Sequence, residues 1–273
     1  MNKFWFLLCA GMALAAVSNY QSEIAAWRSE REAKLKADGG WLSLAGLFWL
    51  HDGANPFGKA ESNEIALPDG PERAGVFELH DGKVTVREGG AARLIAHDSS
   101  DVVKAGRLSL FVIKRGDKFG IRVKDPESEY RRNFHGIQSY PVNESYRVTA
   151  KWVPAPRQIP ILNIIGMTEP SENPGYAVFH LGGQELRLYP IFEEAGAKAL
   201  FYIFRDHTTG KETYPAGRFF YSELPKNGEV VLDFNKAYNP PCAFTPYATC
   251  PLPPKEDNLP VRIEAGEKTY HFE

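Results

Sequence analysis

Two stretches of the C-terminal half bring together side chains that could do acid–base chemistry. Asp206, Glu212 and Arg218 lie around a turn at residues 208–210, and Asp233 ends a later apolar run. Carboxylates can pass protons to or from a substrate, and an arginine beside them can stabilise negative charge. One hypothesis is therefore a hydrolase in which Asp206, Glu212 and Asp233 are catalytic and Arg218 stabilises charge. Carboxylate–arginine pairs are also common as structural ion pairs, so that alternative stays open.

The segment that follows Asp233 is rich in proline, aromatic and amide residues. Proline fixes φ and lacks an N–H donor, so this segment is stiff and does not join a central strand. A stiff display of aromatic and amide groups loses little entropy on binding, which suits a ligand pocket. The alternative is a loop that covers a sheet edge and buries its aromatic side chains. The predicted ligand-binding residues are Tyr214, Arg218, Asn235, Tyr238, Asn239, Phe244 and Tyr247.

Two cysteines in this segment, Cys242 and Cys250, are eight positions apart. In an oxidising compartment this spacing predicts a disulfide, and closing so short a loop would stabilise the fold by about 2.5 kcal/mol in the chain-entropy model. Two reduced, buried thiols are the alternative. The spacing does not fit the C-x-x-C pattern of a redox or zinc site.

Several other chemistries have no motif in this sequence. The seven histidines are scattered without H-x-H or H-E-x-x-H spacing, so no metal site is predicted, although distant residues could still assemble one. No G-x-S-x-G elbow, Walker loop or dinucleotide fingerprint is present, and no cofactor is predicted. The net charge is −2, from 32 basic and 34 acidic residues, with no basic stripe. We therefore expect no nucleic-acid partner.

The first eighteen residues have the composition of a signal peptide. Lys3 precedes the uncharged apolar stretch Phe4–Val17, and small residues near its end suit cleavage. This stretch is short for a transmembrane span. We predict export to the periplasm or the extracellular space, with no transmembrane span after cleavage; an uncleaved anchor and a buried N-terminal helix are the alternatives. Lipoprotein anchoring through Cys9 is not expected, because Leu8 stands where a small residue is required.

One helix is predicted after this leader. No proline or glycine interrupts Ser22–Asp38, and Gly39-Gly40 ends it. Most of its residues are charged or small, so we expect a surface helix with Ile24, Trp27 and Leu35 on its inward face.

Short apolar runs separated by turn residues fill the rest of the chain. Asp81-Gly82 and Gly116-Asp117 predict hairpin turns, and later runs predict further strands, among them residues 146–153, 161–165 and 261–264. Without helix-length patterns between them, these strands favour antiparallel sheets in a sandwich or barrel. The fold class is therefore mainly β. The predicted organisation is a signal peptide (1–18), an N-terminal helix (19–40), a β-sandwich (41–124) and a C-terminal β domain (125–273), with a linker at 124–140.

Part of the predicted sandwich resembles a known domain. The stretch from Phe57 through Gly58-Lys59 to Asp69 is similar to the opening signature of forkhead-associated domains. The resemblance implies a β-sandwich of the type that reads phosphothreonine. Lys59, however, stands where that family has an arginine, and residues 71–76 lack the family's serine and histidine. Because lysine cannot make the bidentate contact that arginine makes with phosphate, we expect no phosphopeptide binding.

Nearly everything after the leader resembles one bacterial family, domain of unknown function 1684. The motifs that carry this resemblance lie in residues 41–47, 124–126, 206–218 and 233–254. The resemblance implies no activity, because the family has no established one.

Three functions remain open on the sequence alone. The leading hypothesis is an exported protein that binds a small polar or amphipathic ligand in the C-terminal β domain, between residues 206–218 and 233–250. The alternatives are the hydrolase described above and a structural or envelope-interaction protein without a small-molecule site.

Overall fold

The computed structural model describes residues 4–272, with side chains from residue 19 onward. The predicted signal peptide, residues 1–18, thus lies outside the described side chains. Helix α1 (Phe4–Lys36) opens the chain and begins well before the predicted start at Ser22. None of the described helices is both long and apolar enough to cross a membrane.

The inward face of α1 is the one predicted. Ile24 and Leu35 are buried and Trp27 is half-buried, while most neighbouring positions are exposed. The helix ends at Lys36, and the Gly40 N–H closes the following turn by donating to the Ala37 carbonyl at 2.7 Å. Lysines in the last turn favour the negative end of the helix dipole.

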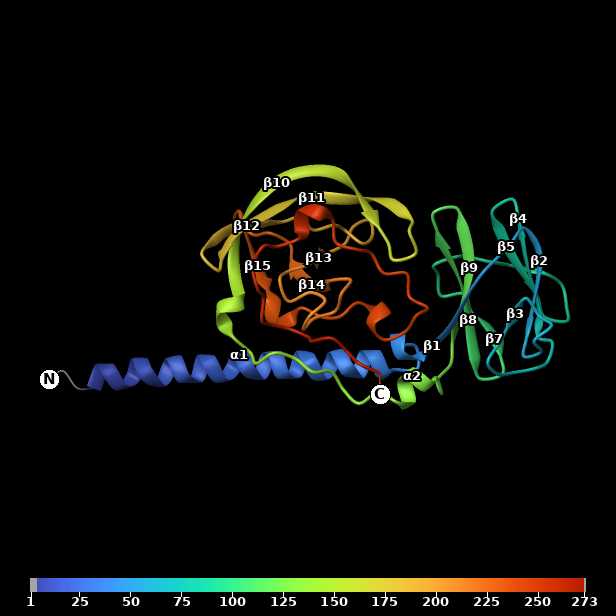
Figure 1. The fold of residues 1–273 in the computed structure, drawn as a ribbon, viewed down its shortest axis with the longest axis horizontal. Coiled ribbons are helices and arrows are strands. Elements are labelled where there is room, and N and C mark those ends of the chain that lie inside the picture. Colours follow the sequence, from blue (N-terminus) through green and yellow to red (C-terminus); the bar gives the residue numbers. More distant parts are fainter. Residues whose placement is uncertain (1–3, 273) are drawn as a thin grey trace.

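Residues 44–124 form two sheets that pack face to face (Figure 1). The first sheet has the order β1-β9-β8-β7 and the second β3-β2-β4-β5-β6, and β2–β3 is the parallel pair. Alternate residues of both sheets, such as Phe57, Phe77, Leu110 and Ile121, meet in one core, because successive side chains of a strand point to opposite faces. The strands are β1 (Leu44–Trp49), β2 (Gly53–Gly58), β3 (Ile65–Ala66), β4 (Gly75–His80), β5 (Lys83–Arg87), β6 (Arg93–Ile95), β7 (Val103–Ala105), β8 (Leu108–Arg115) and β9 (Lys118–Lys124).

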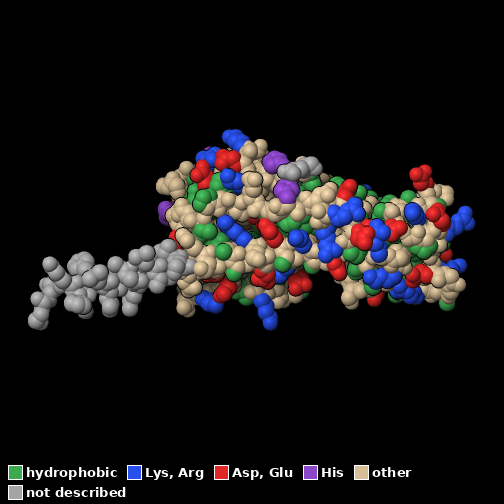
Figure 2. All heavy atoms as spheres, turned by 90° about the horizontal axis from the view of Figure 1, so that it is seen from below, with side chains coloured by type: hydrophobic (Ala, Val, Ile, Leu, Met, Phe, Trp, Pro, Cys, Tyr) green, Lys and Arg blue, Asp and Glu red, His purple; other side chains and the backbone are tan. Residues whose placement is uncertain are grey.

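The two predicted hairpin turns of this sandwich are confirmed. Asp81 and Gly82, at φ 49° and 69°, join β4 to β5. Both central residues of such a two-residue turn need positive φ, which glycine and aspartate tolerate best. Gly116, at φ 56°, opens the turn between β8 and β9, where the first central residue alone has positive φ. Figure 2 shows basic and acidic side chains interspersed over the sandwich end of the molecule on the face displayed.

The C-terminal unit consists of a curved sheet that arches over a two-stranded ribbon (Figure 1). The sheet has the order β12-β11-β10-β15, and the ribbon pairs β13 with β14. A short helix and several 3-10 turns connect or follow these strands. The elements are α2 (Glu129–Arg132), β10 (Arg147–Leu162), β11 (Thr168–Leu181), β12 (Gln184–Leu188), β13 (Ala199–Phe204), β14 (Arg218–Glu223), β15 (Glu229–Asp233), and 3-10 turns at Trp41–Ser43, Glu144–Tyr146, Phe234–Lys236, Pro241–Ala243 and Lys255–Asp257.

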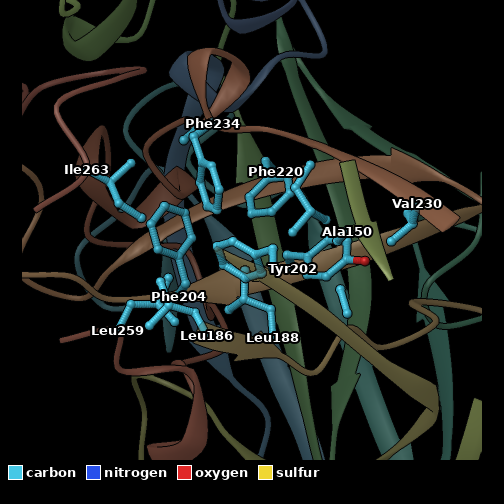
Figure 3. Packing of buried hydrophobic residues seen from close by; sticks show 14 of the residues in the cluster. Ala150, Leu186, Leu188, Tyr202, Phe204, Phe220, Val230, Phe234, Leu259 and Ile263 are labelled. Carbon is cyan, nitrogen blue, oxygen red and sulfur yellow. The ribbon is translucent and has the colours of Figure 1, made fainter. Parts of the chain in front are cut away.

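An aromatic core joins the two layers of this unit. Tyr202 and Phe220 stack with their rings parallel at 4.6 Å, and Phe234 contacts Phe220 at 5.1 Å and Phe204 at 5.5 Å (Figure 3). Ring pairs at such distances add to the energy of apolar burial. These contacts hold the sheet, the ribbon and the start of the C-terminal tail together.

Two strand predictions are corrected by the structure. The predicted strand 146–153 and the start of the predicted strand 161–165 belong to one long strand, β10, whose register shifts between Pro154 and Arg157, and residues 163–165 lie beyond its end. Residues 261–264 are buried at Val261 and Ile263 but form no strand. There the Ile263 N–H donates to the Asp206 carboxylate at 2.6 Å and the Ile263 carbonyl accepts from Arg218 at 3.0 Å. Side chains thus satisfy backbone groups that a neighbouring strand would otherwise pair.

Candidate functional site

A cavity of about 440 Å³ lies where α1, the sandwich and the C-terminal unit meet. Its wall comes from one face of α1, from the last residue of β8 and a middle residue of β9, from the β13–β14 ribbon and from the segment 238–251. The tail reaches this place because Tyr238 pairs with Phe219 of β14 through two backbone hydrogen bonds, at 2.9 and 2.8 Å.

Aromatic rings form one side of this cavity. Tyr238 stands at the centre, with Trp27 at 6.5 Å, Phe219 at 5.9 Å and Tyr221 at 6.3 Å between ring centroids. Arg31 of α1, also a wall residue, lies over the Tyr238 ring at 4.6 Å and holds it in place. The rings are positioned by a helix, a strand and a stiff loop, and they offer an ordered apolar surface.

Cationic groups form the side next to the sandwich. Arg115 donates from Nε to the Thr249 Oγ1 at 3.1 Å, and Arg122 approaches the same oxygen at 3.5 Å. Trp41 lies under the Arg122 guanidinium at 5.1 Å. The cavity is therefore amphipathic, with the ring cluster around Tyr238 on one side and the guanidinium groups of Arg115 and Arg122 on the other.

A second cavity of about 210 Å³ adjoins the first and shares Arg115, Glu193, Phe201, Thr249 and Pro251 with it. Its further wall comes from β10, β11 and the residues after β12. The shared residues make the two cavities neighbours at the junction of sandwich and C-terminal unit.

Asp206 and Arg218, which the sequence placed together, form a buried ion pair. Their side chains are 0% and 1% exposed, and the closest nitrogen–oxygen distance is 3.5 Å. Asp206 also accepts from the Thr208 hydroxyl at 2.7 Å, and Arg218 donates to the carbonyls of Ile263 and Ala265. The pair thus ties the turn at 206–213 and β14 to the C-terminal tail.

The other two predicted catalytic carboxylates have separate partners. Glu212 binds Tyr140 at 2.7 Å and Arg262 at 2.5 Å, and the hydrogen bonds from Arg262 and Tyr140 hold its pKa below the usual range. Asp233 accepts from the Tyr20 hydroxyl at 2.8 Å and so anchors α1. A general acid at neutral pH needs a raised pKa, the opposite of the Glu212 shift. Among the described residues no hydrogen bond or ion pair joins these three carboxylates, and the hydrolase stays a prediction without supporting geometry.

Of the predicted ligand-binding residues, Tyr238 lines the cavity between α1 and the sandwich. Asn235 and Asn239 are fully buried and bind backbone groups of Asn143 and Lys268, respectively. The remaining aromatic residues of that set pack against other parts of the chain: Tyr214 donates to the Cys242 carbonyl, Phe244 lies against Phe134 and Tyr270, and Tyr247 meets Tyr130 edge to face.

Sequence reasoning missed the wall residues that come from α1 and from the sandwich. Trp27 is predicted on the inward face of the helix, and no role in a site is predicted for Trp27 or for Arg122. The one signal for Arg122 is its position between Ile121 and Val123 in an apolar run. Those two neighbours point into the sandwich, so Arg122 points out of it and is buried by the C-terminal unit instead.

Cys242 and Cys250 are both free in the structure. The Cys242 N–H donates to the Cys250 Sγ at 3.2 Å, so the two residues are neighbours. A hydrogen bond between the thiols lowers the pKa of Cys242 and, together with burial, raises that of Cys250. Cys242 is therefore the thiol that ionises first, and a thiolate is the form that attacks in disulfide exchange. The disulfide itself stays a prediction.

Mild oxidation of the purified protein is expected to join Cys242 to Cys250. Titration of thiols in the denatured protein would then find two fewer than in the reduced protein, and a peptide mass map would show the link. The linked form should unfold with a free energy higher by about 2.5 kcal/mol in a urea titration. The variant Cys250→Ser is the control, because it cannot form this link; an equal gain in that variant would contradict the assignment.

This architecture defines a mainly β protein with an N-terminal helix followed by several antiparallel sheets, and with a cavity at the junction of its parts. The chain belongs to the family described as protein of unknown function DUF1684, whose model matches residues 132–268. The motifs at 206–218 and 233–254 predicted this membership, while those at 41–47 and 124–126 lie outside the matched residues. An uncharacterized protein of Haloarcula marismortui, solved by NMR in solution, is similar at 33% sequence identity. The similar region covers 51% of this chain and 79% of that one, with a TM-score of 0.42. No curated protein matches.

Among the described residues no group of three or more His, Cys, Asp or Glu side chains is placed to hold a metal ion.

Proposed function

We propose that this protein is an exported binding protein that takes a small amphipathic molecule into the cavity between α1, the sandwich and the C-terminal unit. The observation that carries the proposal is the cavity itself. Its volume of about 440 Å³ falls within the range of small-molecule sites, and it joins aromatic rings to a few polar groups.

The construction of the wall supports a site that exists before the ligand arrives. Tyr238 is held by backbone pairing with Phe219 and by Arg31, and Arg31 is itself fixed by Glu267 at 3.3 Å and by the Asn239 carbonyl at 2.9 Å. Side chains that are already ordered lose little entropy when a ligand binds. The predicted location in the C-terminal β domain is thus extended, because α1 and the sandwich also contribute wall residues.

Ligand binding is expected to raise the melting temperature of the protein, since a ligand that binds only the native state stabilises it by about 2.7 kcal/mol at one hundred times its dissociation constant. A panel of small aromatic acids, amides and alcohols would be screened by thermal shift. Binding should also change the tryptophan fluorescence, because Trp27 and Trp41 lie in the wall.

Tyr238→Ala is expected to weaken binding of any such compound by about tenfold, since a ring contact contributes about 0.5–1.5 kcal/mol beyond its buried area. Tyr247→Ala is the matched control, a tyrosine of the same segment that packs on Tyr130 outside this wall. Titration calorimetry on both folded variants would compare them. Equal losses in the two variants would place the site elsewhere, and no shift with any compound of the panel would refute the proposed function.

A further inference from the structure

Arg122 differs from the other cations of the cavity wall because it is buried without an ion-pair partner. The residue is 9% exposed, its Nε has no hydrogen-bond partner, and among the described residues no carboxylate lies within ion-pair distance of it. Its contacts are the long 3.5 Å approach to Thr249 and the ring of Trp41. Burying a cation costs free energy unless an anion pairs with it. A bound anion would therefore stabilise this guanidinium.

The other charged residues of the wall already have partners. Arg31 pairs with Glu267, Lys34 with Glu30 at 2.6 Å, and Arg115 with Asp98 at 2.9 Å. The wall carboxylate Glu193 accepts from the Tyr221 hydroxyl. That hydroxyl is neutral, so Glu193 keeps its negative charge, and Arg122 is the one cation of the wall without a carboxylate partner in the described part of the chain.

Arg115 adds to the positive field at the same point. Both guanidinium groups approach the hydroxyl of Thr249, which can accept from each but cannot neutralise either. Burial, and then the charge of Arg115, lower the pKa of Arg122 to about 10, while the negative charge of Asp98 opposes this fall; at neutral pH Arg122 still carries its charge. Two guanidinium groups that converge on a cavity are the usual means of holding a carboxylate or phosphate oxygen.

The fold keeps Arg122 in this place. It lies in the middle of β9, opposite Leu47 of β1 on one side and Phe111 of β8 on the other. A central strand of a sheet cannot shift its register without turning the whole row of side chains to the wrong face. The guanidinium is thus presented by a rigid element, with Trp41 against it.

We propose that the molecule bound in this cavity is an organic oxyanion, whose carboxylate or phosphate group is bound by Arg122 with help from Arg115 and Thr249, and whose apolar part lies against Trp27, Phe219 and Tyr238. This inference rests on the proposed function and specifies the chemical class of the ligand. The charged end points to the sandwich, and the apolar end to the helix and the ribbon.

Three probes test the charge requirement in the intact protein: 3-phenylpropanoate, its neutral amide 3-phenylpropanamide, and phenyl phosphate. Titration calorimetry is expected to show at least about tenfold tighter binding of the carboxylate than of the amide, because a hydrogen bond to a charged group contributes more than a neutral one. Tighter binding of phenyl phosphate than of the carboxylate would assign a phosphate, and the reverse order a carboxylate. Equal binding of acid and amide would overturn the inference and leave the proposed function standing, and binding of none of the three would count against both.

Variants of Arg122 locate the effect. Arg122→Met should abolish the preference for the acid and leave amide binding within about twofold, whereas Arg122→Lys should retain part of the preference, since lysine keeps the charge without the fork. Arg87→Met is the control, an exposed arginine of β5 that pairs with Glu78. Without ligand, Arg122→Met should melt at a higher temperature than the native protein, because it removes an unpaired buried charge. A lower melting temperature, or an undiminished preference in that variant, would show that Arg122 serves the fold and not the ligand.

Discussion

Replacing Arg218 with methionine is expected to lower the free energy of unfolding by about 3–5 kcal/mol, because it leaves a buried carboxylate without its counter-ion. Asp206 and Arg218 are both almost completely buried, and Arg218 also donates to two tail carbonyls, those of Ile263 and Ala265. In the variant these carbonyls lose their donor, which adds to the penalty. Urea denaturation followed by circular dichroism would measure the loss.

Arg187→Met is the matched control for this experiment. Arg187 lies on β12 with 54% of its side chain exposed and faces Glu185 at 3.8 Å. Exposed pairs contribute about 0–1 kcal/mol, so the control should unfold almost like the native protein. The double variant Asp206→Leu with Arg218→Met should recover part of the loss, since apolar residues can replace a buried pair. A loss below about 1 kcal/mol in the single variant would contradict the structural role.

The Asp206–Arg218 ion pair shows which features of the candidate site the sequence can predict and which it cannot. The turn between Asp206 and Arg218 brings the two residues near each other, and the sequence predicted that proximity. It could not predict burial, because the residues that cover the pair, Ile263 and Ala265, lie at least 45 positions further along the chain. Whether such an ion pair is structural or reactive depends on its burial. The role of Asp206 and Arg218 could therefore be decided only from the fold.

Local signals account for the parts of the fold that were predicted well. Asp81-Gly82 specifies a hairpin on its own, since its positive φ values fit few other residue pairs. The inward positions of α1 follow in the same way from helical spacing. Residues 261–264 had the composition of a strand, yet their backbone partners are distant side chains, and no local pattern contains that information.

The cavity was the least predictable feature, because three separate parts of the chain form it. The proline and aromatic residues after Asp233 predicted a binding segment there, and one residue of that segment, Tyr238, lines the cavity wall. Arg122 lies in a strand and Trp27 in a helix whose sequence patterns are fully explained by the strand and the helix themselves, so neither pattern indicates a binding site. Only the packing of the C-terminal unit against the outer face of β9 and against α1 gives those residues a common environment.

The second large effect on the free energy of unfolding is expected for Arg31→Met, because Arg31 attaches α1 to the C-terminal tail. Arg31 bridges the helix to the tail through Glu267, which is 3% exposed, and through the Asn239 carbonyl. Without Arg31 this buried carboxylate retains the Asn239 N–H, at 2.7 Å, but loses its ion-pair partner. We expect the free energy of unfolding to fall by about 3 kcal/mol at pH 8. The control Lys34→Met, which removes an exposed pair with Glu30 one turn further along α1, should change it by less than about 0.5 kcal/mol.

The pH dependence of this loss distinguishes a buried charge from lost packing. Burial already raises the pKa of Glu267, and Arg31 opposes that rise, so the variant should raise the pKa further. A carboxyl whose pKa is higher in the folded than in the unfolded state binds more protons when folded, and stability is therefore lost as the pH rises through the folded pKa. Conversely, as the pH falls from about 8 towards the unfolded value near 4.3, Glu267 becomes neutral and the penalty of the variant should shrink. Urea titrations of the native protein and of Arg31→Met at several pH values would measure this trend. A difference that stayed constant across that range would mean that Arg31 stabilises α1 through its packing on Tyr238 and not through its charge.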